Sequence, residues 1–325
     1  MKRLFVLVVL LGILGMTTWA QMGPETGMLA KSLFGIDGLA VLEVALPSEV
    51  SYNPAAVPLA LELFDEKSYV ELDYGSLDFK AGPEVVNTWQ LCAFRAKKLG
   101  LRLARYSIES DPAPTKFAGP DYQVEFKGET YEAAAGLSLT DQLAVGVAWV
   151  PYERIVTNIF ADGDLLATFE AKTTSQLRYG AVFAPSKALS FGLVSSRGNA
   201  SNRMTIPALS SRPASVEDYK ENLTTLGVGY QPIEGTILSA AWQKGSLEGN
   251  GLDANIDLAT YGLKQYLNPD FSVNVSLNDR TWGYGLTYAK GGTTLGMSYA
   301  PDTYRSAEDY LGRCRTWYFW FGKSW

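Results

Sequence analysis

The chain has 325 residues, of which 12% are aromatic, and its 34 acidic and 28 basic residues give a net charge of −6. This net negative charge argues against a nucleic-acid partner, which requires a basic face. It contains no histidine, so Ser-His hydrolysis is excluded and the commonest metal ligand is missing. We expect no enzyme, no metal and no cofactor, with carboxylate or Ser-Lys chemistry as the remaining enzymatic alternative.

The first twenty residues have the layout of a secretory signal peptide. Lys2 and Arg3 precede an apolar run from Leu4 to Met16, and small residues up to Ala20 offer a cleavage site. The run is short for about 30 Å of hydrocarbon, which makes a membrane anchor the weaker alternative. We expect residues 1–20 to be removed on export, and since both charges lost are positive, the mature chain is more acidic.

Residues 21–66 form a separate segment that does not alternate in hydropathy. Asn53 is a good N-cap and Pro54 a good first helical residue, so a short apolar helix is expected from Pro54 to about Phe64. This helix is too apolar for open water. It should pack inside, or across the periplasmic mouth of, the barrel expected for residues 67–325.

From Tyr69 onward the sequence alternates with a period of two, which is typical of strands that face two different environments. Phe271, Val273, Val275 and Leu277, for example, share one face. The pattern predicts fourteen strands near 69–78, 87–96, 99–109, 122–138, 142–152, 173–184, 188–196, 223–231, 235–245, 256–266, 271–278, 281–289, 292–300 and 313–325.

Alternation alone also fits a soluble sandwich with one buried face. Trp and Tyr near strand ends, tight turns such as 184–187, and long polar loops expected near 153–172, 197–221 and 301–313 instead indicate an outer-membrane barrel. We therefore predict an all-β transmembrane antiparallel up-and-down β-barrel of about 14 strands in the bacterial outer membrane, with an N-terminal plug. Outer-membrane lipid is then one partner.

Several details of the strands are expected to be irregular. The segments 87–96 and 99–109 alternate poorly because they carry several Arg and Lys residues. In 122–138 the apolar residues switch from even to odd positions, and a bulge near Gly128 would explain the switch. Cys92 and Cys314 are interpreted as small strand residues, with pairing as the less favoured alternative.

The last segment ends in alternating aromatic residues, Trp317, Phe319, Phe321 and finally Trp325. A soluble edge strand of this kind would be an aggregation hazard. The segment is similar to the C-terminal signature of outer-membrane proteins, and this resemblance implies recognition of Trp325 by the barrel-assembly machinery. As the fourteenth strand, it should pair with the strand near Tyr69.

Ser48 and the run from Tyr52 to Ala56, just before the first strand, resemble the long-chain fatty-acid transporter (FadL-type) superfamily. This resemblance implies a 14-stranded barrel with an N-terminal hatch in its lumen that contains the Asn-Pro-Ala. It implies a channel for hydrophobic small molecules such as fatty acids, with hatch-gated passage. The PorV-type relatives imply the alternative, a scaffold or binding barrel for protein secretion or envelope partners.

Under the transporter hypothesis, candidate residues lie in the hatch and in the lumen. The hatch and ligand candidates are Leu29, Leu33, Phe34, Asn53, Pro54 and Ala55, and Arg102 and Arg178 are candidate lumen charges for a carboxylate. Glycines at lumen-facing positions, such as Gly146, Gly180, Gly285 and Gly296, either leave room for the hatch and a ligand or ease strand coiling. The segment 101–109 has no Gly or Pro to predict a wall kink for lateral exit.

Overall fold

The computed structural model describes residues 53–63, 66–115, 119–205, 215–249, 252–278, 282–301 and 313–325. The expected signal peptide and the candidates Leu29, Leu33 and Phe34 lie outside these residues. Within them, one helix, α4 (Ala56–Leu63), precedes a series of strands. No helix in this part of the chain is long and apolar enough to cross a membrane.

The strands follow one another along the chain and pair as antiparallel neighbours. They are β1 (Ser68–Phe79), β2 (Glu84–Ala96), β3 (Leu99–Ser110), β4 (Ala113–Thr115), β5 (Gly119–Ser138), β6 (Leu143–Ala161), β7 (Asp164–Ser186), β8 (Leu189–Thr205), β9 (Ser215–Ile233), β10 (Thr236–Gly249), β11 (Leu252–Tyr266), β12 (Phe271–Asn278), β13 (Trp282–Lys290), β14 (Thr293–Pro301) and β15 (Cys314–Ser324).

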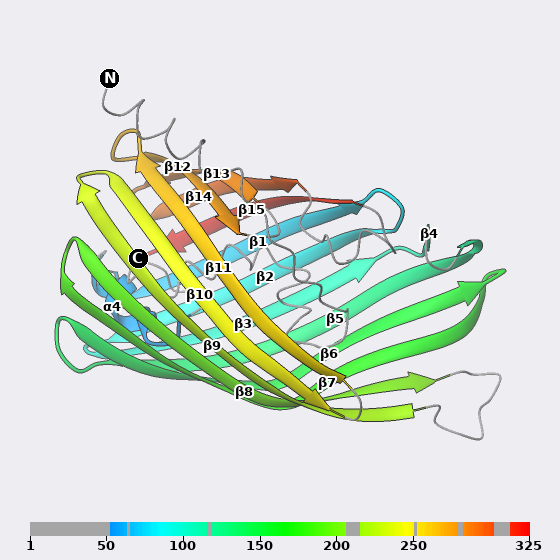
Figure 1. The fold of residues 1–325 in the computed structure, drawn as a ribbon. Helices are drawn as coiled ribbons and strands as arrows, with labels where there is room; N and C mark the ends of the chain where they lie inside the picture. Colours follow the sequence, from blue (N-terminus) through cyan, green and yellow to red (C-terminus); the bar gives the residue numbers. More distant parts are fainter. Residues whose placement is uncertain are drawn as a thin grey trace.

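Fourteen of these strands close into one barrel (Figure 1). β3 pairs directly with β5, and β15 pairs with β1 with Tyr69 opposite Ser324. The short β4 pairs only with β5 and lies outside the ring. Both the predicted number of strands and the predicted closing pair are confirmed.

The two ends of the barrel differ. Short connections such as the β2–β3 turn at Lys97, whose φ is 56°, lie at the end where β1 begins and β15 finishes, and we call this the short-turn end. At the opposite far end, β6 and β7 form a long hairpin that turns at Asp162 and Gly163 (Figure 1). The tight turn expected at 184–187 lies at the short-turn end, as do the connections between β9 and β10 and between β11 and β12.

Side chains alternate between the lumen and the outer surface. On β3, Arg102 and Ile108 are buried inside, whereas Leu101 and Leu103 are exposed outside. Exposed apolar side chains occur around the circumference, and Leu103, Trp149 and Tyr261 are all more than half exposed. In water so much apolar surface would promote aggregation, but it suits a wall that faces lipid.

The prediction of long loops at 153–172 and 197–221 was wrong for the residues of these segments that the structure describes. β6 and β7 cover 153–172 except for a two-residue turn, while β8 runs to Thr205 and β9 begins at Ser215. These segments are polar because the strands continue past the apolar outer surface, so polarity indicated the environment rather than a loop. Of the loop expected at 301–313, residues 302–312 lie outside the described residues.

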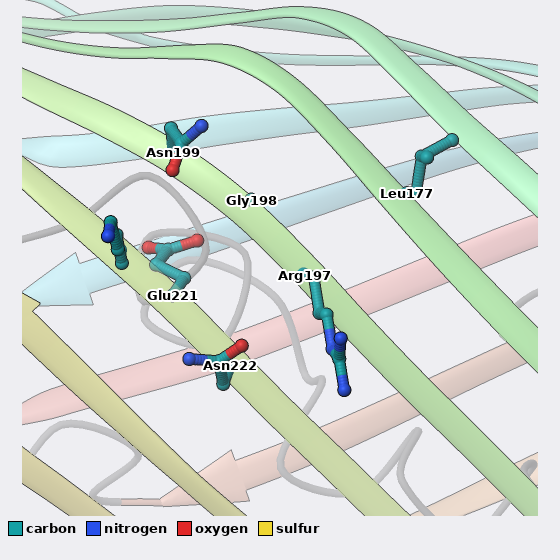
Figure 2. A pocket seen from close by; sticks show the side chains of 7 residues that line it. Leu177, Arg197, Gly198, Asn199, Glu221 and Asn222 are labelled. Carbon is teal, nitrogen blue, oxygen red and sulfur yellow. The ribbon is translucent and has the colours of Figure 1, made fainter.

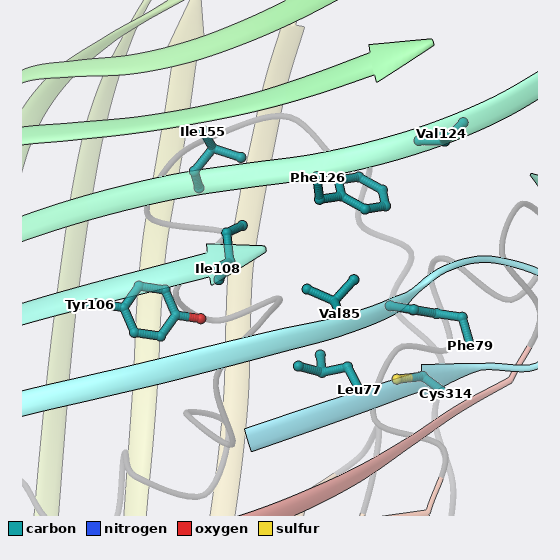
Figure 3. Close-up of a cluster of buried hydrophobic side chains, with 9 residues drawn as sticks. All are labelled: Leu77, Phe79, Val85, Tyr106, Ile108, Val124, Phe126, Ile155 and Cys314. Carbon is teal, nitrogen blue, oxygen red and sulfur yellow. The ribbon is translucent and has the colours of Figure 1, made fainter. Parts of the chain in front are cut away.

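The bulge in β5 is not at Gly128. β5 pairs with β3 without interruption from Lys127 to Leu137, and its register shift lies at Tyr131–Ala133, where it pairs with β6. The apolar residues switch phase because Val124 and Phe126 face inward and join an apolar cluster at the far end of the lumen. Figure 3 shows this cluster, to which β1, β2, β3, β5, β6 and β15 contribute side chains.

The two poorly alternating segments, 87–96 and 99–109, form β2 and β3. Their charged residues fit these strands because each has a suitable environment. Arg102 faces the lumen, Arg105 lies outside against Glu129, and Lys97 occupies a turn. Cys92 on β2 and Cys314 on β15 are strand residues that form no disulfide with each other, in line with the favoured interpretation. On the last strand, Trp317, Phe319 and Phe321 face outward, as the predicted pattern requires.

Candidate functional site: the lumen beside residues 53–63

Residues 53–63, which we call the lumen segment, begin with a turn fixed by Asn53. The Asn53 side-chain oxygen accepts a hydrogen bond from the Ala55 backbone N–H at 3.0 Å, and the Asn53 carbonyl accepts one from the Ala56 N–H at 3.0 Å. Its side-chain amide donates to the carbonyl of Ala181 on β7 at 3.1 Å. Asn53 thus caps the helix and attaches it to the barrel wall.

Helix α4 follows this turn at the short-turn end of the barrel (Figure 1). It begins at Ala56, two residues after the predicted start, because Pro54 and Ala55 form the capping turn. Pro58 lies in the first turn of the helix, where a backbone N–H has no helical partner, so its missing donor costs little. The helix ends at Leu63, close to the predicted Phe64.

Four glycines from neighbouring strands form a row beneath the lumen segment. Gly100 on β3 lies opposite Gly136 on β5, Gly136 opposite Gly146 on β6, and Gly146 opposite Gly180 on β7. A Cβ on Gly100 would lie 2.6 Å from the Pro58 nitrogen, and one on Gly146 would lie 2.5 Å from the Pro54 carbonyl carbon. Neither distance is tolerable, so this glycine row is a flat strip of backbone that admits the lumen segment.

The apolar side chains of the lumen segment complete the contact. Val57 and Leu61 pack against Leu91 and Ala93 of β2. On the other side, Ala55, Ala56 and Leu59 pack against Ala144 of β6 and Val182 of β7. Burying a side chain the size of Val or Leu contributes about 1.5–3 kcal/mol. The segment is therefore held mainly by apolar burial, and Asn53 sets its position.

Immediately beyond the glycine row, toward the far end, three buried charges form an ion cluster. Arg102 on β3 and Arg178 on β7 both contact Glu132 on β5; the Arg178 Nη1 to Glu132 Oε2 distance is 3.0 Å. All three residues are at most 4% exposed. Removing one partner from such a buried pair typically costs about 3–5 kcal/mol, because the remaining charge is left without compensation.

Gln176 lies next to this ion cluster, two residues before Arg178 on β7. It is fully buried and faces the lumen. Neither its amide nitrogen nor its carbonyl oxygen has a hydrogen-bond partner among the described residues. A buried amide in this state is a ready hydrogen-bonding group for a polar atom in the lumen.

The structure brings the described candidates together in two adjoining groups. Asn53, Pro54 and Ala55 lie on the glycine row, and Arg102 and Arg178 lie in the layer beyond it. The carboxylate that the two arginines hold is the chain's own Glu132. Of the glycines, Gly146 and Gly180 admit the lumen segment.

Sequence reasoning missed Gly100, Gly136, Glu132 and Gln176. Glu132 and Gly136 share the even positions of a strand whose neighbours are mostly alanine. A single acidic residue among small residues on an inward face could have indicated that Glu132 is a functional residue of the lumen. The alignment of four glycines across four strands was not visible, because it depends on the register between strands.

No family model matches the chain, and no curated protein matches it. Several solved structures do. A Pseudomonas aeruginosa FadL homologue superposes with a TM-score of 0.56 at 11% identity, over 94% of this chain and 99% of that one. The CymD monoaromatic hydrocarbon channel gives 0.55 at 9% identity over 87% and 94%, and the Pseudomonas putida toluene transporter TodX gives 0.51 at 11% over 85% and 91%.

The chain has the FadL-type fold. The similarity extends over nearly the full length of each of these proteins, so it includes the whole barrel and not only a shared hairpin repeat. This confirms the expected 14-stranded antiparallel architecture. At 9–11% identity the likeness concerns the fold alone, and the PorV-type alternative stays a prediction.

Proposed function

We propose that this protein is a bacterial outer-membrane channel for hydrophobic small molecules, closed by an N-terminal hatch that comprises residues 21–66. The lumen segment is the part of this hatch that rests on the barrel wall. Leu29, Leu33 and Phe34 belong to the proposed hatch by their place in the sequence. The chain acts by binding and passage, without a chemical step.

The observation that carries the proposal is the seating of the lumen segment on the glycine row. A barrel that is merely filled needs side chains from its wall in the lumen. Here four strands instead present bare backbone, against which Asn53, Pro54 and Pro58 lie. A side-chain hydrogen bond from Asn53 and apolar contacts hold the segment to the wall. Such a contact can separate without breaking the barrel's own hydrogen bonds.

The outer surface supports the proposed location. Exposed Trp and Tyr side chains such as Trp149, Tyr179, Tyr230 and Trp282 occur on strands around the barrel. Aromatic girdles of this kind mark the borders of the apolar band in outer-membrane barrels. A wall with this surface and a FadL-type fold fits an outer membrane.

The ion cluster favours uncharged solutes. A fatty-acid carboxylate would need a cationic side chain in the lumen, and Arg102 and Arg178 already share Glu132. Displacing Glu132 would leave a buried carboxylate uncompensated. Gln176 offers a neutral hydrogen-bonding group in the same region, and the apolar cluster of Figure 3 lies further along the lumen. Toluene and monoaromatic hydrocarbons, named for two of the similar structures, are of this uncharged type.

The test is uptake by intact cells of a bacterial strain that lacks its own channels for hydrophobic compounds. Cells that produce the chain should take up labelled toluene faster than cells without it, and labelled oleate at the background rate. Uptake of neither solute, with the folded barrel present in isolated outer membranes, would contradict a channel and favour the scaffold alternative. Uptake of oleate alone would overturn the uncharged solute class.

A further inference from the structure

The outer face of one side of the barrel carries a belt of basic side chains. Seven neighbouring strands, β3 and β5 to β10, each present an exposed, outward-facing Lys or Arg. These residues, which we call the basic belt, are Arg105, Lys127, Arg154, Lys172, Arg197, Lys220 and Lys244. Because the whole chain has a net charge of −6, this concentration of cations is a local feature.

The basic belt lies where the lipid-facing surface ends. A transmembrane strand needs about 9–11 residues to cross the hydrocarbon, and the segment of β9 from Tyr230 to Lys220 has this length. Several cations of the basic belt also lie over aromatic rings. Arg105 lies 5.8 Å from the ring centroid of Tyr131, and Lys172 lies 5.9 Å from that of Tyr152. Cations above interfacial aromatics are typical of the headgroup level of a membrane.

Among the strands, the belt is confined to one side, and it is only partly neutralised. The strands that flank it, β2 and β11, carry Glu84 and Asp257 near their far ends, and Asp257 lies opposite Lys244. On β1 and β15, Asp78 lies opposite Arg315. Within the belt, the three cations Arg105, Lys127 and Arg154 pair with glutamates. Lys172, Arg197, Lys220 and Lys244 form no ion pair with any residue that the structure describes.

A hollow of about 280 Å³ lies on the wall at β7, β8 and β9, and two of the cations without an ion pair, Arg197 and Lys220, line it. Figure 2 shows the side chains around this hollow. Arg197 lies opposite Asn222, and Asn199 lies opposite Lys220, so two cations and two amides form a square on neighbouring strands. Between Arg197 and Asn199, Gly198 contributes backbone only, and Leu177 forms an apolar border. Glu221 also lines the hollow, but its side chain belongs to the buried, inward-facing set of β9.

We propose that this hollow, with the basic belt around it, binds the phosphate groups of a membrane lipid with a multiply phosphorylated headgroup. A guanidinium, an ammonium and two amides supply the donors that phosphate oxygens accept. Lys172, on the β7 side of the hollow, can neutralise a second phosphate. Leu177 leads from the hollow onto the apolar wall, where the acyl chains would lie. The inference rests on the proposed membrane location and does not depend on what passes through the lumen.

The test uses the purified full chain in neutral detergent micelles, titrated with lipid A, a disaccharide lipid that carries two phosphates. The double variant Arg197→Gln/Lys220→Gln removes the two cations of the hollow. A matched control, Lys98→Gln/Lys187→Gln, removes two exposed cations at the short-turn end. With about a fivefold loss for each cation, the first variant should bind about 25-fold more weakly, while the control should bind like the unaltered chain. Native mass spectrometry would count the bound lipids.

Three results would overturn the proposal. Equal binding by both double variants would show that the hollow is not the site. Equal binding of lipid A and of the same lipid without phosphates would show an apolar lipid contact only. Inhibition by inorganic phosphate at concentrations comparable with the lipid would show a site for the free ion. Solute uptake is measured separately on the same variants, so a failed channel with intact lipid binding, or the reverse, is recognisable.

Discussion

Inward-facing glycines occur on both sides of the barrel, but different neighbours fill the space that they leave. On the β3–β7 side, the glycine row admits the backbone of Asn53 and Pro54. On the β12–β15 side, Gly285 lies against the Asn274 side chain and Gly296 against the indole ring of Trp320. The same feature in the sequence therefore serves a separate chain segment in one region and simple packing of the wall in the other.

The difference is one of register rather than composition. Gly100, Gly136, Gly146 and Gly180 lie directly opposite one another, which makes a continuous strip. Gly285 lies opposite Ser298 and Gly296 opposite Trp320 and Thr287, so each is an isolated gap. An inward glycine indicates a docked segment only where the neighbouring strands repeat it in register.

The largest loss of stability should come from a change in the ion cluster. This cluster lies beside the glycine row, whereas Gly285 and Gly296 lie against Asn274 and Trp320. Glu132→Gln leaves Arg102 and Arg178 buried without their shared carboxylate, and should lower the free energy of unfolding by about 3–5 kcal/mol. Urea unfolding of the barrel in detergent, followed by loss of heat-modifiable migration on gels, measures this. Glu129→Gln, which breaks the exposed pair with Arg105, should lower the free energy of unfolding far less, because solvent screens that pair. Equal effects of the two variants would contradict the buried cluster.

The next largest effect should come from a substitution in the glycine row, compared with one at an isolated glycine on the β12–β15 side. Gly146→Val should push Pro54 off the wall, at a cost of about 1–3 kcal/mol, and admit hydrophilic antibiotics that intact cells exclude. Gly296→Val is the matched control, since Trp320 rather than the lumen segment must move. Antibiotic sensitivity of cells with equal amounts of each folded barrel is the measurement. Sensitivity that rises equally in both variants would remove the distinction between the two regions.

A smaller effect should follow the loss of the Asn53 side chain. Asn53→Ala removes the helix cap and the hydrogen bond to Ala181, and the cap alone is worth about 1 kcal/mol. Amide hydrogen exchange should therefore accelerate in residues 53–63 and stay unchanged in β13 and β14. Asn53→Asp keeps the capping oxygen but lacks the donor to Ala181. Its exchange rate in residues 53–63 should therefore lie between those of the unaltered chain and of Asn53→Ala. Unchanged exchange in Asn53→Ala would show that apolar packing alone positions the segment.

The sequence was sufficient for the barrel because each strand carries its own signal. Alternation, turn residues and the aromatic end at Trp325 are local, so fourteen strands and the closing β1–β15 pair could be predicted. Polar segments such as 153–172 were misread, because a strand that continues past the apolar outer surface loses its alternation while keeping its pairing. The helix cap at Asn53 and Pro54 could be predicted because a capping motif is local as well.

The remainder of the site depends on contacts between distant strands. Arg102, Glu132 and Arg178 are on β3, β5 and β7, and nothing near any one of them in sequence indicates the others. Arg102 and Arg178 were identified as lumen charges, but their partner was expected to be a ligand. Only the register showed that Glu132 lies between them.

The central claim is that the lumen segment closes the barrel by lying against this wall, and a reversible cross-link tests it most directly. Ala56 and Ala144 belong to the same buried cluster, so Ala56→Cys and Ala144→Cys, with Cys92→Ser and Cys314→Ala, join α4 to β6. Toluene uptake is then measured before and after reduction. We predict that the disulfide forms in the folded barrel, that uptake falls to the background rate, and that a reductant restores it. A folded barrel in which no cross-link forms, or in which the cross-link leaves uptake unchanged, would contradict the claim.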